Sequence, residues 1–397
     1  MSKQKKKVMV PALRFPELRD AGEWELKELG DCLDYLQPTK YLVSSTAYDD
    51  KYKTPVLTAG KTFVLGYTNE TEGIFDEKLP VIIFDDFTTA SKYVDFPFKA
   101  KSSAMKILLA KGDANIKFCY ESMQMIKYEV GVHERHWISI FSKLSIPTSV
   151  PKEQQKIADC LSSIDELITA QTQKVDALNA HKKGLIQQLF PAEGETVPKL
   201  RFAEFRDMGE WVEKTLGQVA EYENGKAHEQ DIDDQGKYVV VNSKFISTEG
   251  EVKKFSNEAN LLAKKDDILM VLSDVPNGRA IAKCFYVDKD NTYTVNQRIC
   301  KLTAKNTVSV MLFYVLDRNA YFLAFDDGVK QTNLKKDDVL NCPLLLPEDE
   351  AEQQKIADCL SSIDELITAQ TQKVDALNAH KKGLMQQLFP AMDEVGV

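Results

Sequence analysis

Hydrophobic positions recur at alternating spacings of four and three residues through segment 153–192. Such a heptad seam is typical of a helix that packs along another helix. No strong helix breaker precedes Pro191, so the sequence predicts one long helix over 151–191. Its seam consists of Ile157, Leu161, Ile164, Ile168, Val175, Leu178, Leu185 and Leu189, with polar Gln171 and Lys182 in the same series.

The same helix is encoded a second time. Residues 153–192 recur as residues 352–391 with one change in 40 positions, Ile186 for Met385. A looser repeat relates segment 10–30 to segment 197–217, with 14 of 21 positions identical. The second helix therefore carries the same seam, which consists of Ile356, Leu360, Ile363, Ile367, Val374, Leu377, Leu384 and Leu388.

One such helix cannot bury its own apolar seam, so we expect the two helices to pack as an antiparallel coiled coil. The alternative, in which each helix only covers its own neighbouring domain, conflicts with the near-identity of the two helices, because different domains would require different faces. The repeated polar face is explained either by recent duplication or by two equivalent docking surfaces for two copies of one partner. That face includes Gln154, Gln155, Lys156, Gln173, Asp176, Asn179 and Gln187.

Two dissimilar variable segments, about 32–150 and 218–350, lie between the repeats. Short apolar runs bounded by turn signals predict strands at 54–61 and 79–84 in the first segment, and at 237–242 and 267–272 in the second. Each segment then ends in a predicted helix, over 116–130 and 307–325. We therefore expect two α+β domains that share a fold.

Composition narrows the class of protein. The chain has 397 residues, of which 43% are hydrophobic, so two or three packed domains are expected. Segment 1–7 leads into no apolar leader and no run is long enough to span a membrane, which favours a cytoplasmic protein. The seven cysteines form no CxxC pair and indicate neither a disulfide framework nor a zinc site. A net charge of −9 restricts any nucleic-acid contact to local basic patches.

Polar and basic residues on predicted loops of the variable segments are candidate DNA contacts. Arg and Lys match phosphates and guanine, whereas Asn and Gln match adenine. Polar loops that are merely solvated remain the alternative interpretation. The candidates are Lys61, Lys92, Lys99, Lys101 and Arg135 in the first segment, and Asn242, Lys244, Asn277, Arg279, Gln297, Arg298, Lys330, Gln331 and Asn333 in the second.

Catalytic motifs are missing from the sequence. It contains no GxGxxG or GxxxxGK[ST] phosphate loop, no GxSxG elbow and no HExxH pair. The HERH run at 133–136 fits a surface turn better than a metal site, and Asp85-Asp86 fits a structural turn better than a nuclease carboxylate pair. The sequence thus favours a binding scaffold over an enzyme, and no catalytic or metal-binding residue is assigned.

The order of these segments resembles the specificity subunit of Type I restriction-modification systems. The residues that carry the resemblance are IPTSVPKEQQKIA at 146–158, PLLLP at 343–347 with EQQKIA at 352–357, KDDIL at 265–269 and NQRIC at 296–300. The resemblance covers nearly the whole chain.

The resemblance implies two mixed α/β target recognition domains, separated by two long conserved helices packed as an antiparallel coiled coil in a circular, pseudo-twofold repeat. Its boundaries would be 1–150 and 192–350 for the repeat segments with their recognition domains, and 151–191 and 351–391 for the helices. Each domain would read half of a bipartite site in double-stranded DNA, and the helices would set the spacer.

The resemblance also implies partners. Two methyltransferase subunits would dock on the helices, and restriction/translocase subunits would join them in the cytoplasm of a bacterium or archaeon. S-adenosylmethionine, ATP and magnesium would be bound by these partners, and this chain would hold no cofactor. The alternative is a protein–protein adaptor, in which the coiled coil holds two different partner proteins apart.

Overall fold

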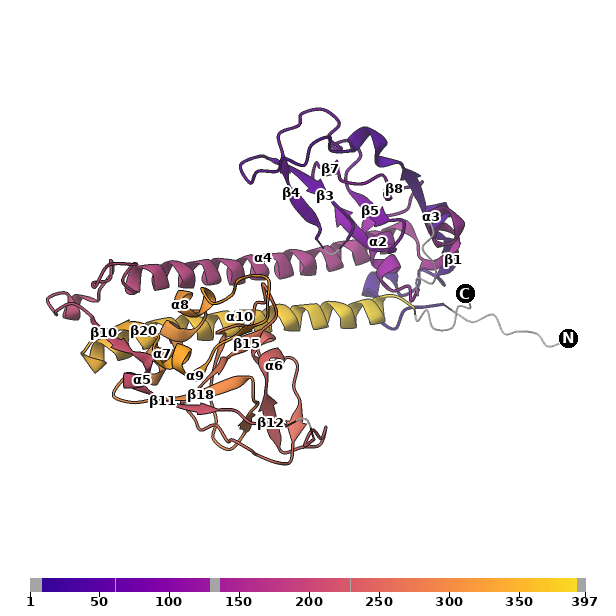
Figure 1. The fold of residues 1–397 in the computed structure, drawn as a ribbon. Helices are drawn as coiled ribbons and strands as arrows, with labels where there is room; N and C mark the ends of the chain where they lie inside the picture. Colours follow the sequence, from indigo (N-terminus) through magenta and orange to yellow (C-terminus); the bar gives the residue numbers. More distant parts are fainter. Residues whose placement is uncertain (1–8, 61, 129–135, 229, 391–397) are drawn as a thin grey trace. The chain divides into compact units, whose positions relative to one another are not determined.

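The computed structural model describes residues 9–60, 62–128, 136–228 and 230–390. The chain divides into two compact units (Figure 1): unit 1 comprises residues 1–173 and 371–397, and unit 2 comprises residues 174–370. Unit 1 thus combines the first and last parts of the chain, as a circular repeat requires. Within the described ranges, no helix is apolar over a length that could cross a membrane.

Each of the two long helices has one end in unit 1 and the other end in unit 2. They are α4 (Pro151–Leu189) and α10 (Glu350–Leu388), each of 39 residues. The predicted boundaries treated these helices as separate from the domains, whereas the structure divides each helix between the units, near residues 173 and 370.

Besides its parts of α4 and α10, the described part of unit 1 contains helices of three to nine residues and strands of two to six residues. The strands are β1 (Glu25–Glu28), β2 (Leu33–Leu36), β3 (Thr54–Leu57), β4 (Val64–Thr68), β5 (Val81–Asp85), β6 (Ser91–Val94), β7 (Lys99–Ala100), β8 (Met105–Ala110) and β9 (Ser145–Thr148). The helices are η1 (Pro16–Leu18), α1 (Leu29–Cys32), η2 (Pro38–Tyr41), α2 (Ile116–Gln124), α3 (His136–Ser139) and η3 (Phe141–Lys143).

Unit 2 is built from a similar series of elements. Its strands are β10 (Val212–Thr215), β11 (Ala220–Asn224), β12 (Tyr238–Val241), β13 (Phe255–Ser256), β14 (Ile268–Val271), β15 (Ser273–Asp274), β16 (Cys284–Tyr286), β17 (Tyr293–Val295), β18 (Ile299–Ala304), β19 (Thr332–Asn333) and β20 (Pro343–Leu346). Its helices are η4 (Ala203–Phe205), α5 (Leu216–Val219), α6 (Ser243–Ser247), α7 (Ser309–Leu316), α8 (Ala320–Leu323) and α9 (Lys336–Leu340).

The two variable domains share one topology. The sheet order β2-β8-β5-β6 in unit 1 corresponds to β11-β18-β14-β16 in unit 2, and β4-β3-β7 corresponds to β13-β12-β17. In both three-stranded sheets the central strand pairs in parallel with the last one, β3 with β7 and β12 with β17. The expectation of two α+β domains with a common fold is therefore confirmed.

Within each unit, α4 and α10 pack in opposite directions. In unit 1, Ile157 and Leu161 near the start of α4 share a core with Leu388 near the end of α10. In unit 2, Leu189 at the end of α4 shares a core with Ile356 and Leu360 near the start of α10. The predicted seam positions are buried or half-buried throughout both helices.

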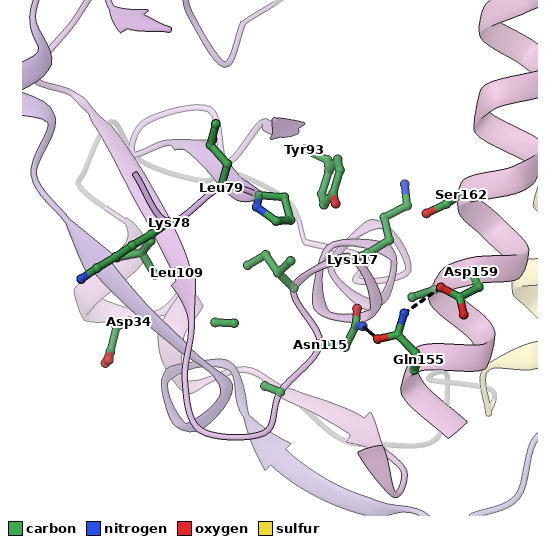
Figure 2. A pocket seen from close by; sticks show the side chains of 15 residues that line it. Asp34, Lys78, Leu79, Tyr93, Leu109, Asn115, Lys117, Gln155, Asp159 and Ser162 are labelled. Carbon is green, nitrogen blue, oxygen red and sulfur yellow. Dashed lines mark hydrogen bonds between the residues drawn. The ribbon is translucent and has the colours of Figure 1, made fainter. Parts of the chain in front are cut away.

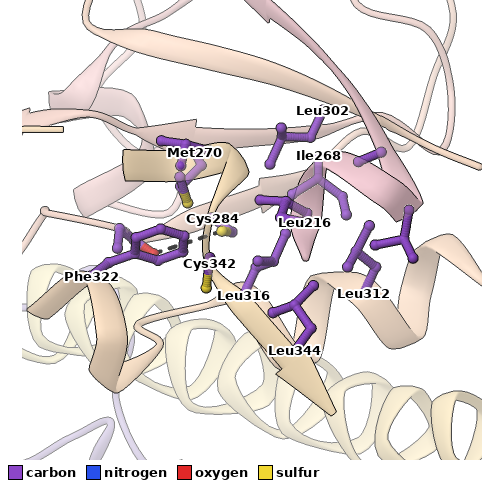
Figure 3. Close-up of a cluster of buried hydrophobic side chains, with 14 of the residues drawn as sticks. Leu216, Ile268, Met270, Cys284, Leu302, Leu312, Leu316, Phe322, Cys342 and Leu344 are labelled. Carbon is purple, nitrogen blue, oxygen red and sulfur yellow. Dashed lines mark hydrogen bonds between the residues drawn. The ribbon is translucent and has the colours of Figure 1, made fainter. Parts of the chain in front are cut away.

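The seam packs against the variable domains as well as against the other long helix. Helix–helix packing and the covering of a neighbouring domain therefore both occur. Phe118 of α2 lies in the same core as Ile157, and Met311 and Leu316 of α7 lie in the same core as Ile356. Figure 3 shows how α7 presents Leu312 and Leu316 to the sheet of unit 2. One apolar stripe can therefore meet a second helix and a domain at once.

The looser repeat holds each domain to the start of a long helix. Arg14 pairs with buried Glu153 at 2.7 Å, and its counterpart Arg201 pairs with buried Glu352 at 2.7 Å. A glutamine one residue further on accepts a backbone N–H at the start of α2 or α7: Gln154 from Asn115 at 3.0 Å, and Gln353 from Val308 at 2.9 Å. Part of the repeated polar face is therefore structural.

The structure shortens several predicted elements. The predicted helix 116–130 forms over Ile116–Gln124, and residues 129–135 lie outside the described ranges. The predicted helix 307–325 is wrong as a single helix, because it divides into α7 and α8. Asp317 leaves the helix to accept the N–H of Cys284 at 2.8 Å, and Asn319 caps the new helix by accepting the N–H of Tyr321 at 2.9 Å.

The carboxylate pair Asp85-Asp86 has a structural role. Asp85 accepts the N–H groups of Phe87 and Thr88, which shapes the turn after β5. Asp86 is buried, pairs with Lys106 at 3.0 Å and accepts the N–H of Trp137 at 2.9 Å. The interpretation as a turn is confirmed.

Candidate nucleic-acid interface

Three loops of unit 2, far apart in sequence, bring the candidate residues together. The first follows β12, where Asn242 caps α6 and Lys244 lies in the first turn of that helix, and the second joins β17 to β18 and carries Gln297 and Arg298. The third loop leads through β19 and carries Gln331 with neighbouring residues. These loops meet because β17 lies beside β12 in one sheet, and β19 pairs with β15.

Two neighbouring cavities lie between these loops. A cavity of about 390 Å³ is lined by Gln297, Arg298, Gln331 and Asn333 among others. A second cavity, of about 370 Å³, is lined by Asn242 and Lys244 and again by Gln297 and Arg298. Because the two cavities share these residues, they adjoin each other, and we call their combined lining the unit 2 loop surface.

The unit 2 loop surface is strongly basic. Its described lining includes Lys244, Lys254, Arg298, Lys335 and Lys336, and it contains no aspartate or glutamate. The whole chain, in contrast, has a net charge of −9. A local positive surface on an acidic protein attracts a polyanion without general basicity.

Three of these lysines were missed by sequence reasoning. Lys335 and Lys336 follow the candidate Asn333 after one residue, so their adjacency was a usable signal. Lys254 precedes β13 and reaches the surface only through the pairing of β13 with β12. No local pattern could have identified it.

Hydrogen bonds preorganise the amide side chains. The Nε2 group of Gln331 donates to Ser273 Oγ at 2.7 Å and to Asn333 Oδ1 at 3.1 Å. Asn242 Oδ1 accepts the N–H of Phe245 at 2.9 Å and caps α6. Burial raises the pKa of Tyr222, which also lines the surface, and its phenol donates to Asn224 Oδ1. The surface therefore offers fixed donors and acceptors beside permanent positive charge.

The remaining unit 2 candidates lie on the adjoining loops. Asn277 and Arg279 are exposed on the loop after β15, and Lys330 is exposed on the loop before β19. Asn277 Nδ2 donates to the carbonyl of Gly328 at 3.1 Å, which links the two loops. The nine candidates of unit 2 thus lie on these loops or on the residues of α6 and β19 that adjoin them.

In unit 1 the described candidates lie on or beside strands of two different sheets. Lys101 follows β7, the counterpart of β17, and its ammonium lies 5.8 Å from the ring centre of Tyr48. Lys92 is half-exposed on β6, opposite Ile83. Lys61 and Arg135 lie outside the described residues.

Lys99 requires a correction. Its side chain is buried, its ammonium pairs with Glu70 at 2.8 Å, and it donates to the carbonyl of Glu72 at 2.6 Å. A lysine in this position stabilises the domain and cannot reach a nucleic acid. We therefore remove Lys99 from the candidate DNA contacts.

Unit 1 also has a larger cavity of about 780 Å³, between its variable domain and α4. Figure 2 shows Asn115, Gln155 and Asp159 linked across one side of it by hydrogen bonds of 2.8 and 2.7 Å. The candidate DNA contacts are not part of its lining. These polar groups hydrogen-bond to one another, which indicates that they hold the variable domain against α4.

The described residues offer no assembled metal site. Within ranges 9–60, 62–128, 136–228 and 230–390, no three His, Cys, Asp or Glu side chains gather in a geometry for a metal ion. Of the HERH run only His136 is described, and its buried ring lies beside Tyr128, with Nδ1 3.3 Å from the phenol oxygen.

A family model described as the Type I restriction modification DNA specificity domain matches the chain twice, at residues 21–180 and 208–379. The two matches together cover most of the chain, one for each unit. They begin inside the two copies of the looser repeat and end inside the two long helices. The duplication seen in the sequence is therefore a duplication of this domain.

Two relatives are specificity subunits. The chain is 44% identical over 222 residues to the Type I restriction enzyme EcoR124I/EcoR124II specificity subunit of Escherichia coli, which is 53% of this chain and 51% of that protein. This match spans about half the length of the relative. The chain is also 24% identical over 404 aligned positions to the MjaVIII specificity subunit of Methanocaldococcus jannaschii, covering 95% of this chain and 93% of that protein.

The fold is similar to a solved S subunit. The crystal structure of the S subunit of the Type I restriction-modification system from M. genitalium matches with a TM-score of 0.67 and 17% sequence identity. The match covers 97% of this chain and all of that one. The two proteins therefore share a fold despite little sequence identity.

Proposed function

The chain belongs to the family of Type I restriction-modification DNA specificity proteins, and we propose that each of its units reads one half of a bipartite DNA site. The observation that carries this proposal is the unit 2 loop surface. Five cations and several oriented amides converge there, and no carboxylate lines the surface among the described residues. Cations hold phosphates and amides read base edges, so this combination suits sequence-specific binding.

We propose that the helix pair sets the spacing between the two half-sites. Helices α4 and α10 each run without interruption for 39 residues, about 58 Å at 1.5 Å per residue. A long helix that is packed along a partner resists bending more than a loop does. The length of DNA between the half-sites is then a property of the protein.

The exposed part of the repeated polar face is our candidate docking surface for two methyltransferase subunits. Gln173, Asp176 and Gln187 are exposed on α4, and the identical Gln372, Asp375 and Gln386 are exposed on α10. Two identical surfaces fit two copies of one partner. Restriction subunits would join this complex, and S-adenosylmethionine, ATP and magnesium would be bound by the partners. This chain would contribute recognition and no catalysis.

The experiment uses Arg298, which lines both cavities of the unit 2 loop surface. The target site is first identified by mapping methylated adenines in the source organism. Binding of the full chain, assembled with its partner subunits, is then measured on variants of each half-site. We expect Arg298→Ala to weaken binding by about 5- to 150-fold and to relax preference in one half-site only, because one base contact contributes about 1–3 kcal/mol.

The matched control is Arg206→Ala, which removes an exposed arginine of the same unit away from these loops. It should leave both half-site preferences unchanged. Equal losses at both half-sites would contradict the assignment of Arg298. A wild-type assembly without any sequence preference would instead favour the protein–protein adaptor.

A further inference from the structure

Two valines on the unit 2 loops expose their side chains to solvent. Val275 is 63% exposed and Val329 is 76% exposed, the two highest values for large apolar residues in the described part of the chain. Val275 lies directly after β15, and Val329 lies on the loop before β19. The hydrogen bond from Asn277 to the carbonyl of Gly328 links the two loops, so these loops together present two exposed aliphatic side chains.

Hydrogen bonds hold both loops in fixed shapes. The Asp274 carboxylate accepts the N–H groups of Val275 at 2.9 Å and Ala280 at 2.6 Å. The Asp327 carboxylate accepts the N–H of Val329 at 2.9 Å. These acids therefore serve the loop backbones, and the valines are presented in advance of binding, which lowers the entropic cost of a contact.

The valines adjoin the basic surface that we assign to DNA. Ser273 lines that surface immediately before the Val275 loop, and Gln331, which bonds to Ser273, lies two residues after Val329. Exposed Arg279 and Lys330 lie on the same two loops. A ligand of these loops must therefore offer negative charge to the cations and an apolar group to the valines, close to each other.

Duplex DNA offers both chemistries in its major groove, where the phosphates flank the C5-methyl groups of thymine. We propose that Val275 and Val329 recognise thymine methyl groups in the half-site bound by unit 2. This inference rests on the proposed function and specifies which base feature the loops read.

The test replaces thymine by deoxyuridine, which pairs identically but has no methyl group. Binding of the full chain in its assembly is measured as each thymine of the unit 2 half-site is replaced in turn. We expect about fourfold weaker binding at one or two positions, the effect of one buried methyl group. Val275→Ala or Val329→Ala should weaken binding to the natural site by a similar factor and abolish the effect of deoxyuridine at its own position.

The control is Val252→Ala, which truncates another exposed valine of unit 2 outside these loops and should retain full sensitivity to deoxyuridine. The valine side chains are exposed, so unchanged thermal melting is expected for all three variants.

Equal binding of thymine and deoxyuridine sites at every position overturns the inference but leaves the proposed function intact, provided that the half-site is still selected. Valine variants that weaken binding yet keep the deoxyuridine effect also overturn it, and they indicate another apolar partner, such as a protein or a base step. Loss of all sequence preference in the wild-type assembly rejects the proposed function itself.

Discussion

The two long helices, α4 and α10, form a helical frame that packs against a different variable domain in each unit. The side chains that contact the charged residues of this frame differ between the two domains. In unit 1, Asp165 of α4 pairs with Lys381 of α10 at 2.8 Å. In unit 2, the identical pair recurs with the helices exchanged, as Asp364 of α10 and Lys182 of α4 at 2.6 Å. The frame therefore presents one carboxylate and one ammonium to each domain.

In each unit, a different side chain of the variable domain contacts this Asp–Lys pair. The sixth residue of α2 is Glu121, which is fully buried and contacts Lys381 at 3.0 Å. The sixth residue of α7 is Tyr314, whose phenol donates to Asp364 at 2.7 Å. Unit 1 balances its additional acid with Lys117, which contacts Glu121 at 2.8 Å and Asp165 at 2.6 Å.

Both solutions leave the cluster electrically neutral. Unit 1 uses two lysines and two acids, whereas unit 2 uses one of each and a phenol. A buried net charge is costly, and Glu121 of unit 1 is fully buried, so its charge must be compensated there. The helical frame therefore restricts the net charge that the adjacent variable domain places beside it more than it restricts the amino-acid sequence of that domain.

The largest expected effect comes from breaking that neutrality in unit 1. Lys117→Met keeps the length of the side chain but leaves two acids, Asp165 and buried Glu121, to share the single ammonium of Lys381. We expect a loss of about 3–5 kcal/mol in the free energy of unfolding, measured in denaturant. Adding Glu121→Gln restores the charge balance seen in unit 2 and should recover most of that loss.

The control for this pair is Lys111→Met, which removes an exposed lysine 3.6 Å from Asp34 and should change stability by less than about 1 kcal/mol. If the losses from Lys117→Met and Glu121→Gln simply add, charge balance is not the governing condition.

A smaller effect distinguishes the two buried tryptophans of the looser repeat. Trp24 Nε1 donates to Glu153 at 3.1 Å, whereas the Nε1 group of its counterpart Trp211 is buried with no partner among the described residues. Both substitutions by phenylalanine reduce volume, but only Trp24→Phe removes a hydrogen bond to a charged acceptor. We expect Trp24→Phe to cost about 1.5–3 kcal/mol more than Trp211→Phe in chemical unfolding. Equal costs would mean that the indole hydrogen bond contributes nothing.

The smallest expected effect is a divergence of the two units in acid. For Asp165, burial alone would raise the pKa, but hydrogen bonds from Lys117 and Lys381 outweigh it and hold the pKa below its usual value of 3.8. The stability that this group contributes is present above the unfolded pKa and is lost as pH falls through the lower folded pKa. For Asp317 in unit 2, burial raises the pKa above 3.8, so protonation favours the folded state there.

Between about pH 5 and pH 3, unit 1 should therefore lose stability relative to unit 2. Amide hydrogen exchange, followed separately in α2 and α7, measures this difference. Asp165→Asn should remove the acid response of unit 1, and Asp317→Asn should remove that of unit 2. Parallel acid profiles in the wild type would contradict the assigned pKa directions.

The sequence alone determined the frame, because its signal is periodic and repeated. The seam from Ile157 to Leu189 requires an apolar partner along its whole length, and the second copy is the only segment in the sequence with the same stripe. Strand positions near Val81 and Ile268 were also readable, since short apolar runs bounded by turn residues have few alternatives. The family resemblance followed from the order of these segments.

Tertiary structure decided which loop residues form a site. Gln297 and Gln331 meet because strand pairing brings their loops together, and Lys254 joins them through β13. Lys99 looked identical to Lys101 in sequence, yet Lys99 is buried and pairs with Glu70 from a distant segment of the chain. Local patterns report periodic burial over many residues, whereas the environment of a single polar side chain depends on contacts from distant segments. The sequence could therefore determine the scaffold, and only the folded chain could determine which residues form the unit 2 loop surface.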